Sequence, residues 1–387
     1  MFRRFALSIA IITTACIAQP AFSMSVPPGE VASCSTHSAK TLGCLARVKV
    51  GPGGKLAAQA APAGYSPAQL RAAYNVPAGS SARVAVVTAY GDPTAKADLD
   101  TYSRTFGLPV LPNCASAAQT GCFEKTDQHG GQKLPKTNAG WAMETALDVE
   151  SIHGMCPGCR IELVEASSAS QANLLTAVDQ AVASGAHVIS MSWGGSESTT
   201  ETSNDQHFAA PATIFIASSG DSGYGTSWPA ASSKVVAVGG TTLMLGAAGR
   251  VSETAWSGSG SGCSKYEAKP SWQHDQACAR RSVADIAADA DPATGAAIYS
   301  GTNSSGAGWY TIGGTSLAAP LIAGMIGVGG GPSLSNVMPR LYASGGTNRL
   351  FDIQSGTTGK CSTYLCKAGA GYDGPTGLGT LNGLGAL

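Results

Sequence analysis

The fold is decided by Arg83-Val84-Ala85-Val86-Val87-Thr88, a continuous run made almost entirely of small and β-branched residues. Such a run is typical of a strand buried on both faces of a parallel sheet, because a half-exposed strand would alternate apolar and polar residues. Similar runs recur at residues 160–164, 187–192, 213–217 and 235–238. The sequence therefore predicts a series of buried parallel strands.

Segments of helical length lie between these runs, for example at residues 141–152 and 170–184. Alternation of strands and helices predicts an α/β fold in which a parallel β-sheet is flanked by helices. We expect residues 64–387 to form one domain, because α/β enzymes of this length occur as single units and no linker interrupts the pattern.

The first residues have the pattern of a secretory signal peptide. Met1-Phe2-Arg3-Arg4 precedes an apolar run over residues 5–17, and Ala21-Phe22-Ser23 supplies small residues for cleavage. Residues 1–23 are therefore interpreted as a signal peptide, and the protein is expected to be secreted, to the extracellular space or the periplasm. Residues 24–63 are rich in Ala, Gly, Pro and Ser without an apolar period, which is typical of a leader or linker.

The cysteine count agrees with an oxidising compartment. Removing Cys16 with the signal peptide leaves ten of the 11 cysteines, an even number. They form near neighbours, and local pairing is the simplest of many connectivities: Cys34/Cys44, Cys114/Cys122, Cys156/Cys159, Cys263/Cys278 and Cys361/Cys366. Cys156-Pro157-Gly158-Cys159 also has redox CxxC spacing, but without a thioredoxin-like context it is interpreted as a structural bridge.

Charge argues against two classes of partner. Only 12% of residues are charged and the net charge is zero, so the clustered Lys and Arg of a nucleic-acid or membrane-surface site are missing. The apolar run near the N-terminus is too short for a transmembrane helix. We expect a soluble monomer that contacts neither nucleic acid nor membrane.

The first candidate for chemistry is Ser316, within Gly313-Gly314-Thr315-Ser316-Leu317-Ala318-Ala319-Pro320. The glycines permit a tight turn and Pro320 is tolerated in a first helical turn, so Ser316 is predicted at the start of a buried helix. An ordinary serine N-cap is the alternative that this segment alone leaves open.

A second candidate is the pair Glu144 and Asp148, whose i, i+4 spacing places both carboxylates on one face of a helix. The segment has no Lys or Arg to pair with them, and its other residues are mainly apolar. Two crowded carboxyl groups in such surroundings tend to share a proton, and their pKa values move apart, which suits acid/base catalysis.

A third candidate is Asp221, within Ser218-Ser219-Gly220-Asp221-Ser222-Gly223. This segment follows the predicted strand at residues 213–217, and ligands bind at the carboxyl ends of strands in open α/β sheets. Taken alone, Asp221 could equally be a turn residue in a glycine-rich loop.

Together these segments resemble the sedolisins, the serine-carboxyl peptidases. The Glu144/Asp148 pair, residues 190–194, residues 219–223 and residues 314–320 occur in the order and approximate spacing of that family. Residues 65–75, Tyr90-Gly91-Asp92-Pro93 and the C-terminal Gly371-Tyr372-Asp373 extend the similarity over nearly all of residues 65–387.

The resemblance implies a subtilisin-like fold and hydrolysis of peptide bonds in protein or peptide substrates at acidic pH, with internal cleavage as the expectation. It also implies four catalytic residues: Ser316 as nucleophile, Glu144 as general base, Asp148 as the group that orients the base, and Asp221 as oxyanion partner. A serine hydroxyl needs a positioned base, and Asp221 can donate to an oxyanion only while protonated, which acidic conditions favour.

The resemblance further implies a Ca²⁺ site near the C-terminus, with oxygen ligands from glycine-rich loops as a hard cation prefers. The implied ligands are the carboxylates of Asp352 and Asp373 and the carbonyls of Ile353, Gly369 and Gly371.

The chain also departs from the family pattern. A long prosegment is usual, yet only about forty residues separate the signal peptide from Tyr65; Gly313 stands where serine is common, and Ala284-Asp285 where Pro-Asp is common. Two alternatives remain at this point. One is a histidine-dependent subtilisin using Asp92 with His129 or His153. The other is a non-catalytic binding module on a peptidase scaffold.

Overall fold

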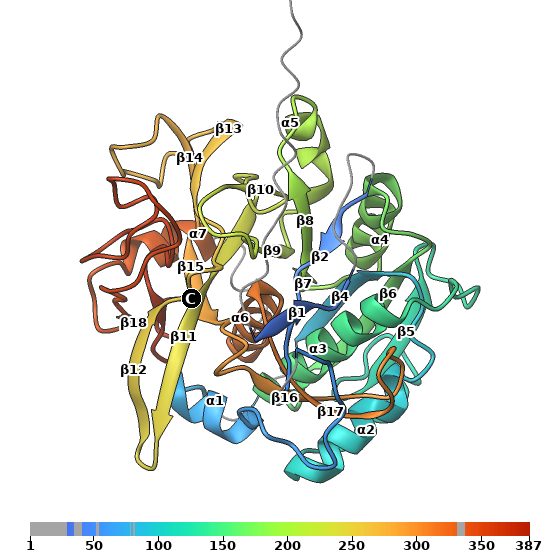
Figure 1. Ribbon diagram of the computed structural model, residues 1–387. Coiled ribbons are helices and arrows are strands. Elements are labelled where there is room, and N and C mark those ends of the chain that lie inside the picture. Colours follow the sequence, from blue (N-terminus) through green and yellow to red (C-terminus); the bar gives the residue numbers. More distant parts are fainter. Residues whose placement is uncertain (1–28, 35–40, 52–53, 78, 80–81, 331–336) are drawn as a thin grey trace, which may run out of the picture.

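The computed structural model describes residues 29–34, 41–51, 54–77, 79, 82–330 and 337–387. The predicted signal peptide lies outside the described residues. Most of the described chain surrounds a ten-stranded sheet with helices on both faces (Figure 1). The predicted α/β, subtilisin-like class with a parallel sheet flanked by helices is confirmed.

The central sheet is parallel along most of its width. Its order is β18 (Leu350–Phe351), β19 (Thr380–Leu381), β15 (Ile286–Asp289), β11 (Val235–Gly246), β9 (Ile214–Ser218), β7 (Val188–Met191), β4 (Arg83–Ala89), β6 (Arg160–Ala166) and β5 (Phe123–Asp127), with β12 (Gly249–Ala255) paired to β11. Neighbours from β19 to β5 run parallel, whereas β18 and β12 pair antiparallel with theirs. Each of the five predicted runs is a strand of this sheet.

Alternating side chains of β4 divide the core into two layers, as the two-residue period of a strand requires. Val84 and Val86 belong to the same buried apolar cluster as residues of α1 (Pro67–Ala73), α2 (Ala95–Phe106), α3 (Ala139–Met155), α6 (Thr315–Val328) and α7 (Val337–Ala343). Ala85 and Val87 face α4 (Gln171–Ala183) on the opposite side. The sheet is therefore covered on both faces.

Helices α3 and α6 form the centre of the larger layer. Asn138 caps α3, since its Oδ1 accepts hydrogen bonds from the N–H groups of Gly140 and Trp141, and every α3 residue from position 141 to 155 is buried. The helices approach closely at Gly324, where an added Cβ would lie 2.7 Å from the Cβ of Met155. Any polar side chain on α3 is therefore held inside the protein.

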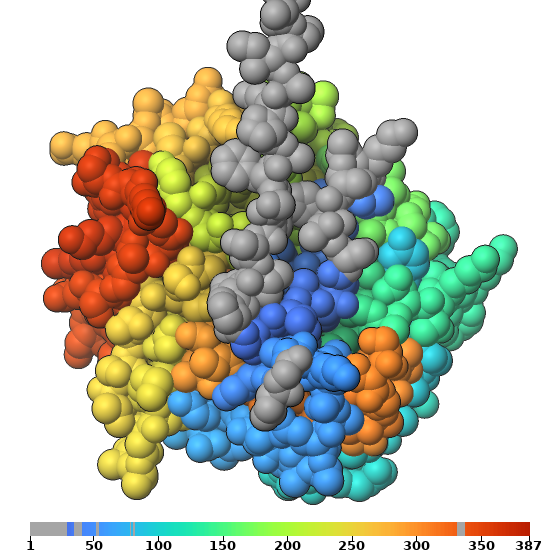
Figure 2. Space-filling model, viewed as in Figure 1, coloured from blue at the N-terminus to red at the C-terminus, as the bar shows by residue number. Residues whose placement is uncertain are grey.

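The predicted leader is ordered where it is described, and it pairs with the rest of the domain. β1 (Glu30–Ala32) and β3 (Arg47–Lys49) join β17 (Gly308–Gly313) and β16 (Ala296–Ser300) in one small sheet. β2 (Gly43–Cys44) joins β8 (Trp193–Ser196) and β10 (Ser227–Trp228) in another. In Figure 2 the leader (blue) lies in the middle of the face shown, between green and yellow parts of the chain.

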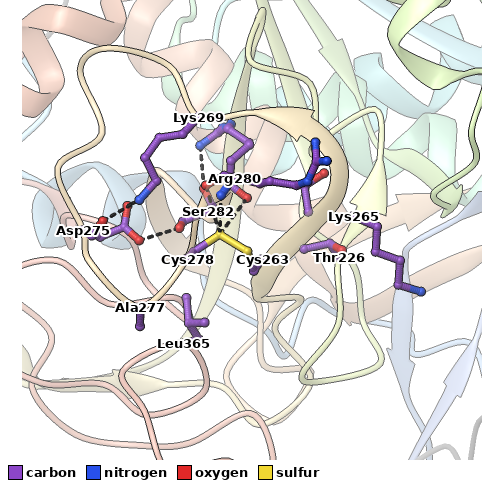
Figure 3. Close-up of a disulfide and its surroundings, with 12 residues drawn as sticks. Thr226, Cys263, Lys265, Lys269, Asp275, Ala277, Cys278, Arg280, Ser282 and Leu365 are labelled. Atoms are coloured by element: carbon purple, nitrogen blue, oxygen red, sulfur yellow. Dashed lines mark hydrogen bonds and ion pairs between the residues drawn. A yellow bond between two sulfur atoms is a disulfide. The ribbon is translucent and has the colours of Figure 1, made fainter.

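All five local cysteine pairs predicted from the sequence are disulfides. One of them, Cys263–Cys278, links β13 (Gly262–Ala268) to the loop before β14 (Arg280–Val283), and an ion pair of 2.9 Å between Lys269 and Asp275 supports the same loop (Figure 3). The remaining elements are α5 (Glu201–Asn204) and the short 3-10 helix η1 (Asp205–Phe208).

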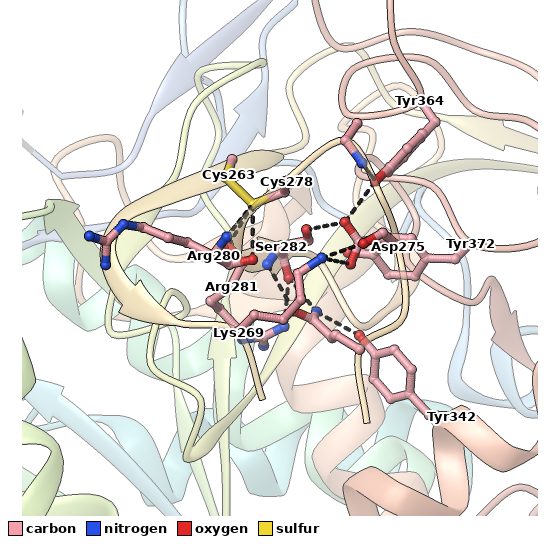
Figure 4. A network of polar contacts seen from close by, with 12 residues as sticks. Cys263, Lys269, Asp275, Cys278, Arg280, Arg281, Ser282, Tyr342, Tyr364 and Tyr372 are labelled. Atoms are coloured by element: carbon pink, nitrogen blue, oxygen red, sulfur yellow. Dashed lines mark hydrogen bonds and ion pairs between the residues drawn. A yellow bond between two sulfur atoms is a disulfide. The ribbon is translucent and has the colours of Figure 1, made fainter. Parts of the chain in front are cut away.

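A polar network fastens the C-terminal region to this hairpin. Asp275 Oδ2 accepts hydrogen bonds from the hydroxyls of Ser282 and Tyr364, each at 2.7 Å (Figure 4). Tyr342 also donates a hydrogen bond to Asp285 at 2.7 Å. Tyr372 packs against Tyr364, with ring centroids 6.1 Å apart. The loops at the C-terminus are thereby held by side chains rather than by long strands.

Candidate active site

The carboxyl groups of Glu144 and Asp148 lie one turn apart on α3, as predicted, and both side chains are fully buried. Burial is the largest cause that raises the pKa of Glu144, and repulsion by Asp148 raises it further. Burial also raises the pKa of Asp148, although a hydrogen bond of 2.5 Å from the Ser192 hydroxyl opposes this by lowering it. Among the described residues, no hydrogen bond reaches Glu144 Oε1 or Asp148 Oδ2. Both carboxyl groups therefore favour the protonated state.

Ser316 lies in the first turn of α6, where the sequence predicted it, and it is fully buried. The turn before it needs glycine, because Gly314 has a φ of 86°. The Ser316 hydroxyl donates to the carbonyl oxygen of Ser192 at 3.3 Å and lies near enough to Glu144 to lower its pKa. Ser192 thus contacts both Ser316 and Asp148.

Asp221 follows β9 at the carboxyl end of the sheet, and it is also buried. Its Oδ1 accepts hydrogen bonds of 2.8 Å from the N–H and the hydroxyl of Thr315, the residue before Ser316. Arg47 Nε lies 3.3 Å from Asp221 Oδ2. Burial raises the pKa of Asp221, and the Arg47 guanidinium is the strongest opposing influence. The structure therefore brings all four predicted catalytic residues into one region.

The histidines considered in the alternative mechanism are engaged elsewhere. His153, in the last turn of α3, forms a hydrogen bond of 3.0 Å with the carbonyl of Pro109, and burial lowers its pKa to about 4. The ring of His129 faces Gln128 at 3.4 Å, and Asp92 Oδ1 accepts from Thr94 at 3.0 Å. The bases available around Ser316 in the described chain are carboxylates.

Sequence reasoning assigned no role to two residues of this site. Ser192 lies in residues 190–194, which contribute only to the family resemblance, and Arg47 lies in the predicted leader, to which no site residue is assigned. The signal for Ser192 is its place at the end of the buried run at residues 187–192, directly after β7, whose carboxyl end lies beside Ser316. Nothing in the sequence places Arg47 near Asp221, because that contact joins residues 174 positions apart.

The residues proposed for Ca²⁺ also converge. Gly369 donates to Asp373 Oδ2 at 3.0 Å, and Gly371 donates to Asp352 Oδ2 at 3.1 Å. Burial raises the pKa of Asp373 to about 7, with repulsion from Asp352 a smaller cause. No lysine or arginine in the described ranges forms a salt bridge with either aspartate. Ile353 is buried in the adjoining loop. Two neighbouring carboxylates without a cation fit a site for a hard divalent ion.

Comparisons with known proteins agree with this geometry. Residues 126–349 match the Subtilase family. Sedolisin of Pseudomonas sp. (strain 101) is 30% identical over 82% of this chain and 60% of its own length, and kumamolisin of Bacillus sp. (strain MN-32) is 30% identical over 84% and 63%. The chain thus spans less than two thirds of these relatives.

This chain also covers nearly the whole length of one similar protein whose structure has been solved. The structure of a Pseudomonas sedolisin, a serine-carboxyl proteinase complexed with pseudo-iodotyrostatin, has a TM-score of 0.70, 29% identity, and coverage of 83% of this chain and 96% of the other. Separately, no helix in the described part of the chain is long and apolar enough to cross a membrane.

Proposed function

We propose that this chain, which belongs to the subtilase family and to the sedolisins within it, is a serine-carboxyl peptidase that hydrolyses peptide bonds in proteins or peptides. One observation carries the proposal. A buried serine hydroxyl at the start of a helix shares its site with three buried carboxyl groups, those of Glu144, Asp148 and Asp221. That combination suits acyl transfer without an imidazole base.

Each residue has one role in the proposed reaction. Glu144 accepts the proton of the Ser316 hydroxyl while Ser316 attacks the substrate carbonyl, and it later returns that proton to the leaving amine. Asp148 orients Glu144 and shares a proton with it, for which the unpartnered oxygens Glu144 Oε1 and Asp148 Oδ2 are available. Asp221, when protonated, donates to the oxyanion that forms on the carbonyl oxygen.

The proposed working pH is acidic. Asp221 can donate only as a carboxylic acid, and its raised pKa keeps it in that form to a higher pH than an exposed aspartate would allow. The Glu144/Asp148 pair must keep one proton and lose the other, which places activity between two ionisations. Secretion belongs to the same proposal, since five disulfides suit an oxidising compartment.

Ca²⁺ is proposed as a structural ion, held by the carboxylates of Asp352 and Asp373 and by carbonyl oxygens of Ile353, Gly369 and Gly371. The bound ion would neutralise the two carboxylates and so stabilise the C-terminal loops. The network of Figure 4 lies beside these loops, because Tyr372 is one residue from Asp373 and donates to the carbonyl of Ala284 at 3.0 Å.

The test uses an unstructured protein substrate incubated at pH 3 to 7, with the products identified by mass spectrometry. Wild type should release peptides, Ser316→Ala should release none above background, and His153→Gln should retain activity. Folding of each variant is checked by its melting curve at the same pH. Equal activity of wild type and Ser316→Ala, or loss of activity in a well-folded His153→Gln, would overturn the proposal.

A further inference from the structure

Ser192 lies between β7 and β8 and contacts two groups of the candidate active site at once. Its hydroxyl donates to Asp148 Oδ1 at 2.5 Å, and its main-chain carbonyl oxygen accepts the hydrogen bond of 3.3 Å from the Ser316 hydroxyl. The residue is fully buried, so neither contact is exposed to solvent. Ser192 therefore connects the candidate nucleophile to the carboxyl group that orients the candidate base.

The Ser192 hydroxyl has one proton to donate, and Asp148 is the acceptor that the geometry favours. The other acceptor within reach is the main-chain carbonyl of Ser316, at the longer distance of 3.4 Å. A separation of 2.5 Å is typical of a hydroxyl that donates to a carboxylate, and such charge-assisted hydrogen bonds are about twice as strong as neutral ones. The Ser192 proton therefore belongs to the contact with Asp148.

Asp148 depends on this contact. Burial raises the pKa of Asp148, and the hydrogen bond from Ser192 is the influence that lowers it. Asp148 Oδ2 has no hydrogen-bond partner among the described residues, and neither has Glu144 Oε1. Because Ser192 occupies Oδ1, the second oxygen of Asp148 remains for the proton that the two carboxyl groups share.

The residues on either side fix the position of Ser192. Met191, the last residue of β7, pairs with Ala217 in the central sheet. Trp193, the first residue of β8, is fully buried, and its indole Nε1 donates to the carbonyl of Val87 at 2.8 Å. A hydroxyl held between two such anchored residues can fix the orientation of a carboxyl group.

We propose that Ser192 is a positioning residue, whose hydroxyl holds Asp148 in place for the proton that it shares with Glu144 and stabilises the negative charge of this carboxyl pair. The inference rests on the proposed peptidase function and deepens it, because it assigns the group that lets the pair ionise under acidic conditions. Ser192 acts through Asp148 and exchanges no proton with the substrate.

The carboxyl pair must carry one negative charge before the base can take the proton of the nucleophile. The titratable groups that face this charge are the two carboxyl groups themselves and Asp221, whose own negative charge would raise the pKa of Glu144. The nearby cation Arg47 is bound to Asp221 and not to the pair. Hydrogen bonds must therefore stabilise the charge, and Ser192 supplies the one to Asp148.

Ser190 provides a matched control, two residues earlier in β7. It is also fully buried, but its hydroxyl has no hydrogen-bond partner in the part of the chain that the structure describes. Ser190→Ala and Ser192→Ala therefore remove the same atom from equally buried positions. Only Ser192→Ala removes a contact with the carboxyl pair, whereas Ser192→Thr keeps the hydroxyl and tests rescue.

The first measurement is kcat/KM of the full chain on a short peptide substrate from pH 3 to 7. The acidic limb of this profile reports the ionisation of the pair in the free enzyme. Ser192→Ala should move the limb to higher pH by about one to two units, because a hydrogen bond to a charged group is lost. At a fixed pH below the limb, kcat/KM should fall about 10- to 100-fold. Ser190→Ala and Ser192→Thr should keep the wild-type limb.

A second measurement follows the carboxyl group without turnover. In the inactive Ser316→Ala background, carbon-13 NMR resolves the titration of the Asp148 side chain, whose signal is identified by its absence in Asp148→Asn. Adding Ser192→Ala should move this titration to higher pH, whereas adding Ser190→Ala should not. Melting curves at each pH confirm that the compared variants are folded.

The outcomes separate this inference from the proposed function. An active wild type whose acidic limb and Asp148 titration are unchanged in folded Ser192→Ala would overturn the inference and leave the peptidase function intact. Equal shifts in Ser192→Ala and Ser190→Ala would also overturn it, because they would reflect altered packing rather than a lost hydrogen bond. A folded wild type that hydrolyses no peptide would instead overturn the proposed function.

Discussion

Replacement of Glu144 by Gln tests the candidate general base against a matched control on the same helix. Glu144 and Glu150 are both fully buried on α3, but Glu144 faces Ser316 whereas Glu150 accepts a hydrogen bond of 2.9 Å from the Tyr299 N–H. Burial raises the pKa of both carboxyl groups. The two substitutions therefore remove the same chemical group from equally buried positions, one of them in the site.

The expected loss follows from the role of Glu144. A positioned general base contributes about 10²–10⁴-fold in rate, which corresponds to about 2.7–5.5 kcal/mol of transition-state stabilisation. We expect Glu144→Gln to lower kcat by at least about 10²-fold. Glutamine keeps an acceptor for the Ala46 N–H but cannot take the proton of the Ser316 hydroxyl. Glu150→Gln should stay within about threefold of wild type.

The assay measures kcat on a short peptide substrate at pH 4, with the melting temperature of each variant as the control for folding. Neither variant should melt lower than wild type at neutral pH, since each removes a buried group whose ionisation is unfavourable. The reasoning would be refuted if Glu144→Gln kept wild-type kcat, or if Glu150→Gln lost as much activity as Glu144→Gln.

Three further predictions concern stability. Excess chelator should lower the melting temperature of wild type loaded with Ca²⁺. Asp373→Ala should melt at the same temperature with and without chelator. A wild-type melting curve that the chelator leaves unchanged would count against the proposed ligands. Burial raises the pKa of Glu162 to about 7, so its contribution to stability is complete below about pH 4.5 and is lost as pH rises through 7. Glu162→Gln should therefore flatten the fall of melting temperature across this range. An equally steep fall in the variant would refute the role of Glu162 in this pH dependence. Arg281 forms a fully buried ion pair of 2.5 Å with Asp285, so Arg281→Met should lower the free energy of unfolding by about 3–5 kcal/mol. Replacement of its exposed neighbour, Arg280→Met, should lower it by less than about 0.5 kcal/mol. Similar denaturation midpoints for the two variants would contradict this prediction.

The sequence predicted the parts of the fold that depend on local pattern. The run at residues 83–88 became β4, and the segment at residues 141–152 became the middle of α3, because burial on both faces leaves a compositional signature. Local cysteine pairing also held, since short loops bring neighbouring sulfur atoms together. The Glu144/Asp148 pair could be recognised because helical spacing alone places the two residues on one face.

The rest depended on contacts between distant residues, which leave no local pattern. The leader has no predicted strands because those it forms are only two or three residues long, and β2 and β3 pair with the distant strands β8 and β17. Its order comes from pairing with the site and from the Cys34–Cys44 disulfide rather than from an apolar period. The contact between Arg47 and Asp221 could not be predicted for the same reason.

The pH dependence of kcat/KM tests the carboxylate mechanism most directly. Activity should rise from strongly acidic pH as the base ionises and should fall as the second carboxyl proton is lost, which gives an optimum below neutral pH. If Asp221→Asn is active, its alkaline limb should move to higher pH, because the amide donates without titrating. Histidine catalysis would instead lose activity below about pH 6. An optimum at about pH 8 or above would contradict the carboxylate mechanism, which predicts an optimum below neutral pH, and would favour a histidine base instead.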